Sequence, residues 1–156
     1  MRMSEGVEWG LHCCLTLAWI GDHKLVSTAT LAKHFGVAPT YLNKCLQALV
    51  RAKILRSASG ARGGFCLAKP PDELTFLDVV IAIEGPDAAF RCTEIRQSEG
   101  CSRDEKRRPC AIAGAMQEAE EAWRTALKAQ TLADIMQKAP AAAAERTRRW
   151  YQEVRR

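Results

Sequence analysis

Aromatic residues are scarce in this sequence of 156 residues, at 6%, and long apolar runs are absent. No apolar run approaches the ~18 residues that a membrane-spanning helix requires, so we expect no membrane association. An apolar content of 47% excludes an intrinsically disordered chain. Residues 1–5 lead straight into an amphipathic segment rather than a signal peptide, which predicts a cytoplasmic location.

Acidic residues are missing from a long stretch in the first half of the chain. Residues 23–69 contain eight Lys or Arg and no Asp or Glu, whereas residues 70–90 contain five acidic residues and no Lys or Arg. A net charge of +5 therefore hides a strongly basic segment. Because carboxylates would repel a polyanion, their exclusion is typical of a surface that faces nucleic-acid phosphates. The alternative is a chance cluster of basic residues on a solvated face.

Apolar residues at three- and four-residue spacing predict three helices in this half of the sequence. The first spans residues 5–20. The second begins at Ser27 or Thr28, either of which can cap it, and stops at Gly36. The third has Pro39 in its first turn. Two short helices around a tight turn predict a helix-turn-helix.

Two short strand candidates follow the helices, at residues 54–57 and 65–68. The loop between them, residues 59–64, contains three glycines that permit a tight hairpin. The expected fold is therefore mainly α with a small β-hairpin wing, a winged helix-turn-helix. Its wing tip carries Arg62 between small residues, so that the guanidinium can enter a narrow groove of DNA.

The second half of the chain contains the longest helical signal. Apolar residues alternate at steps of three and four from Ile112 to Trp123, the spacing of a coiled-coil seam, and we expect the same helix of a second subunit as its partner. The tail is basic, and we expect it to be poorly ordered or helical only in context. The predicted divisions are a DNA-binding domain (1–90), a cysteine-containing sensor loop (91–110), a dimerisation helix with a short following helix (111–138), and a basic tail (139–156).

The third helix of a winged helix-turn-helix lies in the major groove of DNA, where its first residues meet base edges. Hydroxyl, amide and ammonium groups at its exposed positions suit bases and phosphates. The alternative is that Tyr41 packs at the domain edge and Lys44 is merely solvated. The predicted contacts to double-stranded DNA are Ser27, Thr28, Ala38, Thr40, Tyr41, Asn43, Lys44, Gln47, Arg62 and Gly63.

Seven cysteines are an odd and high number for a chain in a reducing compartment. Three of them, Cys14, Cys45 and Cys66, lie on apolar helix or strand patterns and are expected to be buried, while Cys13 is ambiguous.

The other three cysteines lie in the polar stretch 91–110. Cys92, Cys101 and Cys110 have eight residues between each neighbouring pair, and nearby basic residues favour their thiolates. Such thiolates can bind a metal or an iron–sulfur cluster, or form a reversible disulfide. Zinc has little support, because no C-x-x-C pair or neighbouring histidine completes a four-ligand set.

Several segments together resemble a known family, the bacterial winged-helix regulators that include IscR, NsrR and RsrR. They are Glu8 to Cys14, Leu31-Ala32 with Pro39 to Leu42, the GARGGF wing, Leu77 to Val80, and the loop from Cys92 to Cys110. The resemblance covers about residues 1–138. It implies a homodimeric transcription factor, often a repressor and not an enzyme, that commonly senses iron–sulfur status, nitric oxide or redox state.

The first of these segments is most similar to the RsrR-like branch, whose members hold a 2Fe–2S cluster partly through a glutamate of the first helix. The resemblance implies Glu8, Cys101 and Cys110 as ligands here, with Cys92 a ligand or a nearby thiol. Some family members have no cluster and respond instead to a small molecule or to thiol oxidation.

Two other classes of function remain as alternatives. One is a redox or metal-trafficking protein that uses the cysteine loop, and the other is a protein-interaction adaptor that does not bind DNA. The sequence contains no nucleotide-binding glycine loop, acid–base carboxylate pair or nucleophile triad, so we expect no enzymatic activity.

Overall fold

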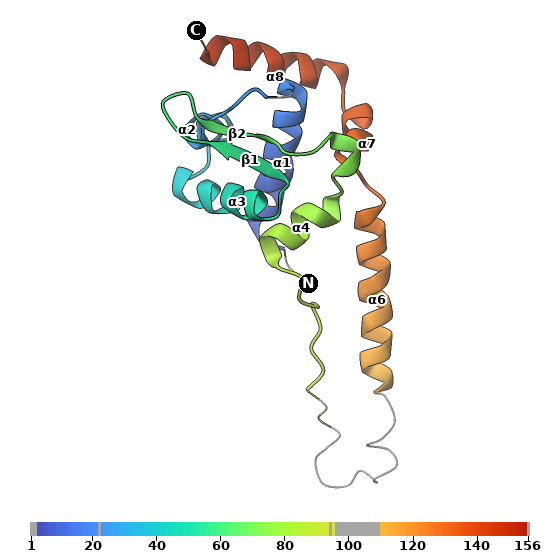
Figure 1. Cartoon of the computed structure of the whole chain (residues 1–156). Helices are drawn as coiled ribbons and strands as arrows, with labels where there is room; N and C mark the ends of the chain where they lie inside the picture. Colours follow the sequence, from blue (N-terminus) through green and yellow to red (C-terminus); the bar gives the residue numbers. More distant parts are fainter. Residues whose placement is uncertain (1–2, 22, 94, 96–109, 156) are drawn as a thin grey trace.

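The computed structural model describes residues 3–21, 23–93, 95 and 110–155. A helical head carries a two-stranded hairpin, and a long helix projects away from it (Figure 1). Within the described residues, no helix is both long and apolar enough to cross a membrane.

The three predicted helices of the head are confirmed as α1 (Glu5–Ile20), α2 (Thr28–Phe35) and α3 (Pro39–Arg51). Ser27 caps α2, because its hydroxyl oxygen accepts a hydrogen bond from the Thr30 amide at 3.1 Å. α2 and α3 pack against each other and form the helix-turn-helix.

The wing consists of β1 (Leu55–Ala58) and β2 (Gly64–Leu67), an antiparallel pair. Both strands differ by one residue from their predicted positions, because Ala58 pairs with Gly64 and shortens the loop to residues 59–63. Reciprocal backbone hydrogen bonds of 3.0 and 2.9 Å join Val26 to Phe65. The wing is thereby fixed to the segment that leads into α2.

Two equivalent helix starts lie beside each other. η1 (Pro71–Glu73) leads to α4 (Phe76–Glu84), which begins with a Thr75–Asp78 capping box, and α7 (Leu132–Lys138) begins with a Thr131–Asp134 box. Thr75 and Thr131 form an isolated β-bridge. The two chain segments are thus joined just before their helices. Val79 and Val80 are the residues of α4 that are buried in the core.

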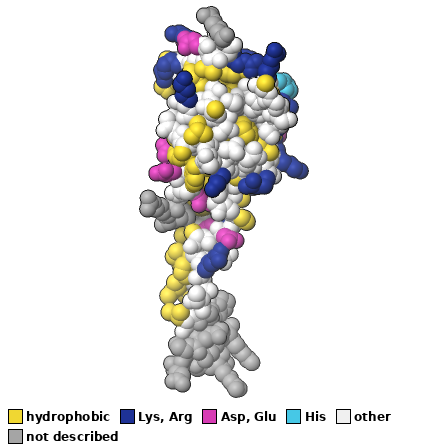
Figure 2. Space-filling view, turned by 90° about the vertical axis from the view of Figure 1, so that its left-hand side faces the viewer, with side chains coloured by type: hydrophobic (Ala, Val, Ile, Leu, Met, Phe, Trp, Pro, Cys, Tyr) yellow, Lys and Arg dark blue, Asp and Glu magenta, His cyan; other side chains and the backbone are white. Residues whose placement is uncertain are grey.

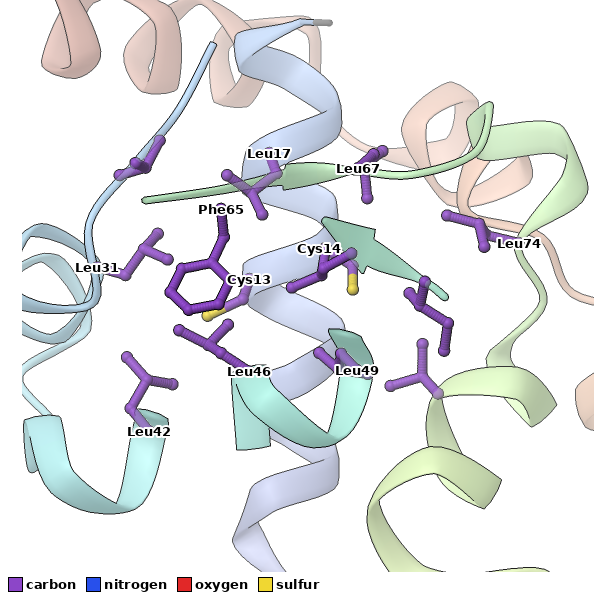
Figure 3. Close-up of a cluster of buried hydrophobic side chains, with 14 of the residues drawn as sticks. Cys13, Cys14, Leu17, Leu31, Leu42, Leu46, Leu49, Phe65, Leu67 and Leu74 are labelled. Atoms are coloured by element: carbon purple, nitrogen blue, oxygen red, sulfur yellow. The ribbon is translucent and has the colours of Figure 1, made fainter. Parts of the chain in front are cut away.

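The hydrophobic core surrounds α1, and α2, α3, α4 and the wing supply its walls (Figure 3). Leu42, Leu46 and Leu49 of α3 are fully buried, so one face of this helix packs into the head while the opposite face remains outside. The predicted burial of Cys14, Cys45 and Cys66 is confirmed, and Cys13 is buried as well.

The long helix α6 (Ala111–Lys128) confirms the helix predicted after residue 110. Its upper part contacts α4, and Arg124 donates hydrogen bonds to the carbonyl oxygens of Pro86 and Asp87. Its first turns lie beyond the head (Figure 1), where Ile112 and Met116 are 69% and 42% exposed.

The basic tail forms a regular helix, α8 (Ala141–Val154), packed across α1. Of the two expectations for this segment, poor order is therefore wrong and a helix stabilised by context is correct. The physical reason is an inward face, on which Thr147 is buried and Trp150 and Tyr151 pack against the core.

Candidate DNA interface and cysteine arm

The outward face of α3 presents most of the predicted DNA-reading side chains. Thr40, Asn43 and Lys44 are exposed, and Ala38 is the exposed residue that precedes the helix. Gln47 is half-buried, which corrects its prediction as an exposed position. The first turns of α3 are therefore the part of this helix that is open to DNA.

Tyr41 combines the two roles considered for it. Its ring packs edge-on against Trp9 of α1, with 5.1 Å between ring centroids, yet 41% of the residue remains exposed. The contact orients the ring at the start of α3.

The start of α2 is tied to α3. The Thr28 hydroxyl donates a hydrogen bond of 3.1 Å to Asn43 Oδ1, which joins two of the predicted DNA-contacting residues. The Ser27 hydroxyl is bound within its own helix cap. Phosphate binding at this helix start would therefore use the backbone amides of the first turn rather than the Ser27 side chain.

The wing tip presents Arg62 outward. This side chain is exposed and forms no ion pair or hydrogen bond with the described residues. Gly63 is half-buried in the turn, where its amide donates to the Gly60 carbonyl oxygen at 2.9 Å. A side chain at this position would place its Cβ 2.3 Å from the Ala58 carbonyl oxygen. A glycine here keeps the turn tight.

Basic side chains are prominent on the side of the molecule that holds α2, the start of α3 and the wing loop. Figure 2 shows this side, where Lys and Arg side chains lie around the rim of the head and its middle is mostly uncharged, with fewer Asp and Glu at the top, on one flank and below. The absence of Asp and Glu from residues 23–69 accounts for this pattern. Such a surface attracts a polyanion along its whole extent.

Glu8 lies in an apolar groove of about 500 Å³ between α1, α4 and α7. His12, one helical turn later, lines the same groove, and both residues are exposed. This pairs a carboxylate with an imidazole on one helix face. Sequence reasoning missed His12, although its spacing of four residues from Glu8 is a visible signal for a shared site.

The predicted cluster ligands do not meet within the described part of one chain. Cys92 is exposed on the segment after α4, and Cys110 is the N-cap residue of α6, while Cys101 lies outside the described residues. Across residues 3–21, 23–93, 95 and 110–155, no three His, Cys, Asp or Glu side chains come together as metal ligands.

The cysteines of α1 are poorly suited to redox chemistry. Burial, with a smaller contribution from neighbouring Cys45, raises the pKa of the Cys13 thiol to about 12. Complete burial also raises the pKa of Cys14. Because thiolates are the reactive species, these two residues act as core packing.

The sequence matches the family described as Rrf2, iron-dependent transcriptional regulator, over residues 3–138. Protein YffB of Lactococcus lactis is 34% identical over 135 residues, which span 86% of each chain. Protein rrf2 of Nitratidesulfovibrio vulgaris is 30% identical over 139 residues, which span 89% of each chain. The matched family is one of regulators, which confirms the prediction of a non-enzymatic protein.

Solved structures share the fold. The structure of CymR, described as the global cysteine regulator of B. subtilis, has a TM-score of 0.70 at 22% identity and covers 90% of this chain and 99% of its own. IscR of T. potens has a TM-score of 0.66 at 20% identity, with 91% and 90% covered. These similarities confirm the predicted winged-helix architecture.

Proposed function

Because the chain belongs to the Rrf2 family of transcriptional regulators, we propose that it is a homodimeric repressor that binds double-stranded DNA through α3 and the wing. We further propose that an iron–sulfur cluster of the RsrR-like kind controls its affinity for DNA. Glu8 and the three cysteines of residues 91–110, here called the arm, would hold the cluster: Cys92, Cys101 and Cys110. The observation that carries DNA binding is the placement of α2, α3 and the wing loop, all free of carboxylates, on one side of the head (Figure 1).

The exposed residues divide between two tasks in DNA recognition. Asn43 at the start of α3 would meet base edges in the major groove, where amides pair with adenine. Lys44 beside it would bind guanine or a phosphate. Arg62 at the wing tip is placed for the adjacent minor groove and its phosphates. The hydrogen bond between Thr28 and Asn43 fixes one helix start against the other.

The donor types on α1 and the arm suit iron. Thiolates of Cys92 and Cys110, the Glu8 carboxylate and the His12 imidazole all bind iron in proteins. Because three of these groups do not come together within the described residues, we propose that Cys101 or a donor of the second subunit completes the set. A cluster bound there supplies a centre whose charge and stability depend on redox state.

Cys110 connects this proposed site to α6, the helix that is expected to pair the subunits. It is the N-cap residue of α6 and lies at the start of that helix. A shift there changes the separation of the two α3 helices, which must match half-sites about 34 Å apart. Ligand binding or oxidation at Cys110 can thus alter DNA affinity without touching α3.

A second candidate keeps the same fold without a cluster. In this case Cys92 and Cys110 respond to thiol oxidation, which their position outside the buried core favours. The two candidates differ in one measurable property, the iron content of the protein.

Substituting both Lys44 and Arg62 with alanine should weaken DNA binding about 100-fold, and the slope of log affinity against log salt should fall by about 2, since each lost phosphate contact removes about 0.9. Fluorescence anisotropy with a labelled duplex measures both quantities. Lys128→Ala/Lys138→Ala, with the same charge change on α6 and α7, is the matched control. Equal affinity of the Lys44/Arg62 variant and wild type would disprove binding through α3 and the wing.

Anaerobically purified protein should contain iron and sulfide and absorb visible light, and Cys92→Ser/Cys110→Ser should lose all three. Serine is a good helix N-cap, so the Cys110 substitution should preserve α6. Glu8→Gln should lower the iron content or shift the spectrum, whereas Glu5→Gln, one turn earlier on α1, should not. An iron-free wild-type protein would exclude the cluster and select the thiol-oxidation candidate.

A further inference from the structure

Helix α8 lies wholly beyond residues 3–138, the part of the chain that matches the family. Five arginines and two glutamates fall within residues 145–156, so this added segment is basic. Neither the family match nor the roles proposed for α3, the wing and the arm account for it.

α8 is held at a defined place on the head. Arg148 Nε donates a hydrogen bond of 3.0 Å to the Trp19 carbonyl oxygen, and the Tyr151 hydroxyl donates one of 3.4 Å to that of Leu25. The Trp150 and His34 rings stack with 3.9 Å between centroids. Leu25 precedes α2 and His34 lies in its last turn. These contacts therefore fix the last turns of α8 next to α2.

The remaining arginines of α8 point away from the core. Arg146 and Arg149 are exposed and form no ion pair or hydrogen bond with any described residue. They are three residues apart and therefore neighbours on one flank of the helix. Between α8 and α2 lies a hollow lined by Trp150 and by Lys33, a third exposed cation.

Helix α8 lies next to the basic surface of the DNA-binding half. Figure 1 places α8 at the top of the head, with its C-terminal end on the side of α2 and the wing loop. Figure 2 views that side, and Lys and Arg side chains gather along its upper edge. The potential that attracts DNA to α3 and the wing thus extends onto α8.

We propose that Arg146 and Arg149 of α8, together with Lys33 of α2, bind phosphates of the DNA duplex outside the base pairs that α3 and the wing contact. This inference rests on the proposed DNA binding of the head. Duplex DNA fits the surface better than an acidic protein does, because Trp150 and Tyr151, the aromatic residues suited to anchor a protein partner, are packed toward the core. The side chains that point outward are those of Arg146 and Arg149. Arginine binds phosphate well, and neither residue has an ion pair with a described residue that would have to break first.

The test is Arg146→Gln/Arg149→Gln, titrated with a labelled random-sequence duplex of about 40 base pairs at several salt concentrations, since phosphate contacts need no particular sequence. The slope of log affinity against log salt should fall by about 2, and affinity at about 100 mM salt should fall at least 10-fold. Arg146→Lys/Arg149→Lys keeps both charges and should retain the wild-type slope. Lys128→Gln/Lys138→Gln, with the same loss of charge elsewhere, is the control.

The outcomes separate this inference from the proposed function. If wild type binds the duplex and the double glutamine variant matches it in affinity and slope, the α8 proposal is overturned and a partner other than DNA is indicated for this surface. If wild type binds no duplex, the DNA-binding function itself fails. We expect equal melting temperatures for wild type and variant, because neither arginine forms a hydrogen bond or ion pair with a described residue. Equal values establish that a change in slope reflects binding rather than folding.

Discussion

Substitution of Gly64 with alanine should lower the free energy of unfolding by about 3 kcal/mol, the upper range for forcing an atom into a packed site. A Cβ at this position would lie 2.5 Å from the carbonyl carbon and oxygen of Val26, and both are backbone atoms that cannot rotate away. The backbone hydrogen bonds between Val26 and Phe65 would have to break or stretch. Chemical denaturation measures the loss of stability directly.

The same substitution should weaken DNA binding, because the Val26–Phe65 bridge fixes the wing beside the start of α2. Gly60→Ala is the matched control within the same hairpin. Its φ of 103° also disfavours an L-residue, but no atom lies within 4 Å of its Cβ position, so only a backbone cost of about 1–2 kcal/mol is expected. If Gly60→Ala destabilises the protein as much as Gly64→Ala does, close packing against Val26 is not the cause.

The helix-turn-helix was predictable because each of its boundaries obeys a local rule. Ser27 supplies a side-chain cap and Pro39 fits a first helical turn, so the positions of α2 and α3 follow from neighbouring residues alone. The wing strands were each wrong by one residue. Their register depends on the pairing of Ala58 with Gly64 across the hairpin, which spacing along the chain does not encode.

The order of the C-terminal tail was the least predictable feature. α8 depends on contacts with residues more than 100 positions away, such as Arg148 with Trp19 and Tyr151 with Leu25. Local helix propensity does not predict such contacts, because tertiary packing supplies most of the stability of a short helix.

The candidate site was predictable in its residues rather than in its assembly. Lys44 and Arg62 are exposed, as the winged-helix pattern predicted. Gln47 directly follows the buried Leu46 on the helix and is half-buried. Glu8 and Cys92 belong to one proposed ligand set, yet no group of three such donors forms in the described chain. Sequence motifs predict chemistry by residue type, but they do not give the distances between donors that are far apart in the chain.

Substitutions on the projecting helix α6 should have the largest effect on function. Replacing both Ile112 and Met116 with aspartate should convert a dimer to monomers at micromolar concentration and lower DNA affinity by about 100-fold or more, since two linked half-site contacts become independent. These side chains are 69% and 42% exposed in one subunit, and their spacing of four residues places them on one face. Analytical ultracentrifugation gives the mass, and anisotropy gives the affinity.

Thr125→Asp is the control for this prediction, because it adds an aspartate to α6 at an exposed position on the side opposite Met116. It should remain dimeric and bind DNA as wild type does.

If the Ile112/Met116 variant stays dimeric, the subunits meet at another surface. A change at Cys110, the N-cap residue of α6, would then not alter the distance between the two α3 helices. If it becomes monomeric but keeps wild-type affinity, one head is sufficient for binding, and control of DNA affinity must act within a subunit. Loss of both dimer and affinity is the result that a spacing switch requires, because only a paired structure converts a small shift at α6 into a mismatch with two half-sites.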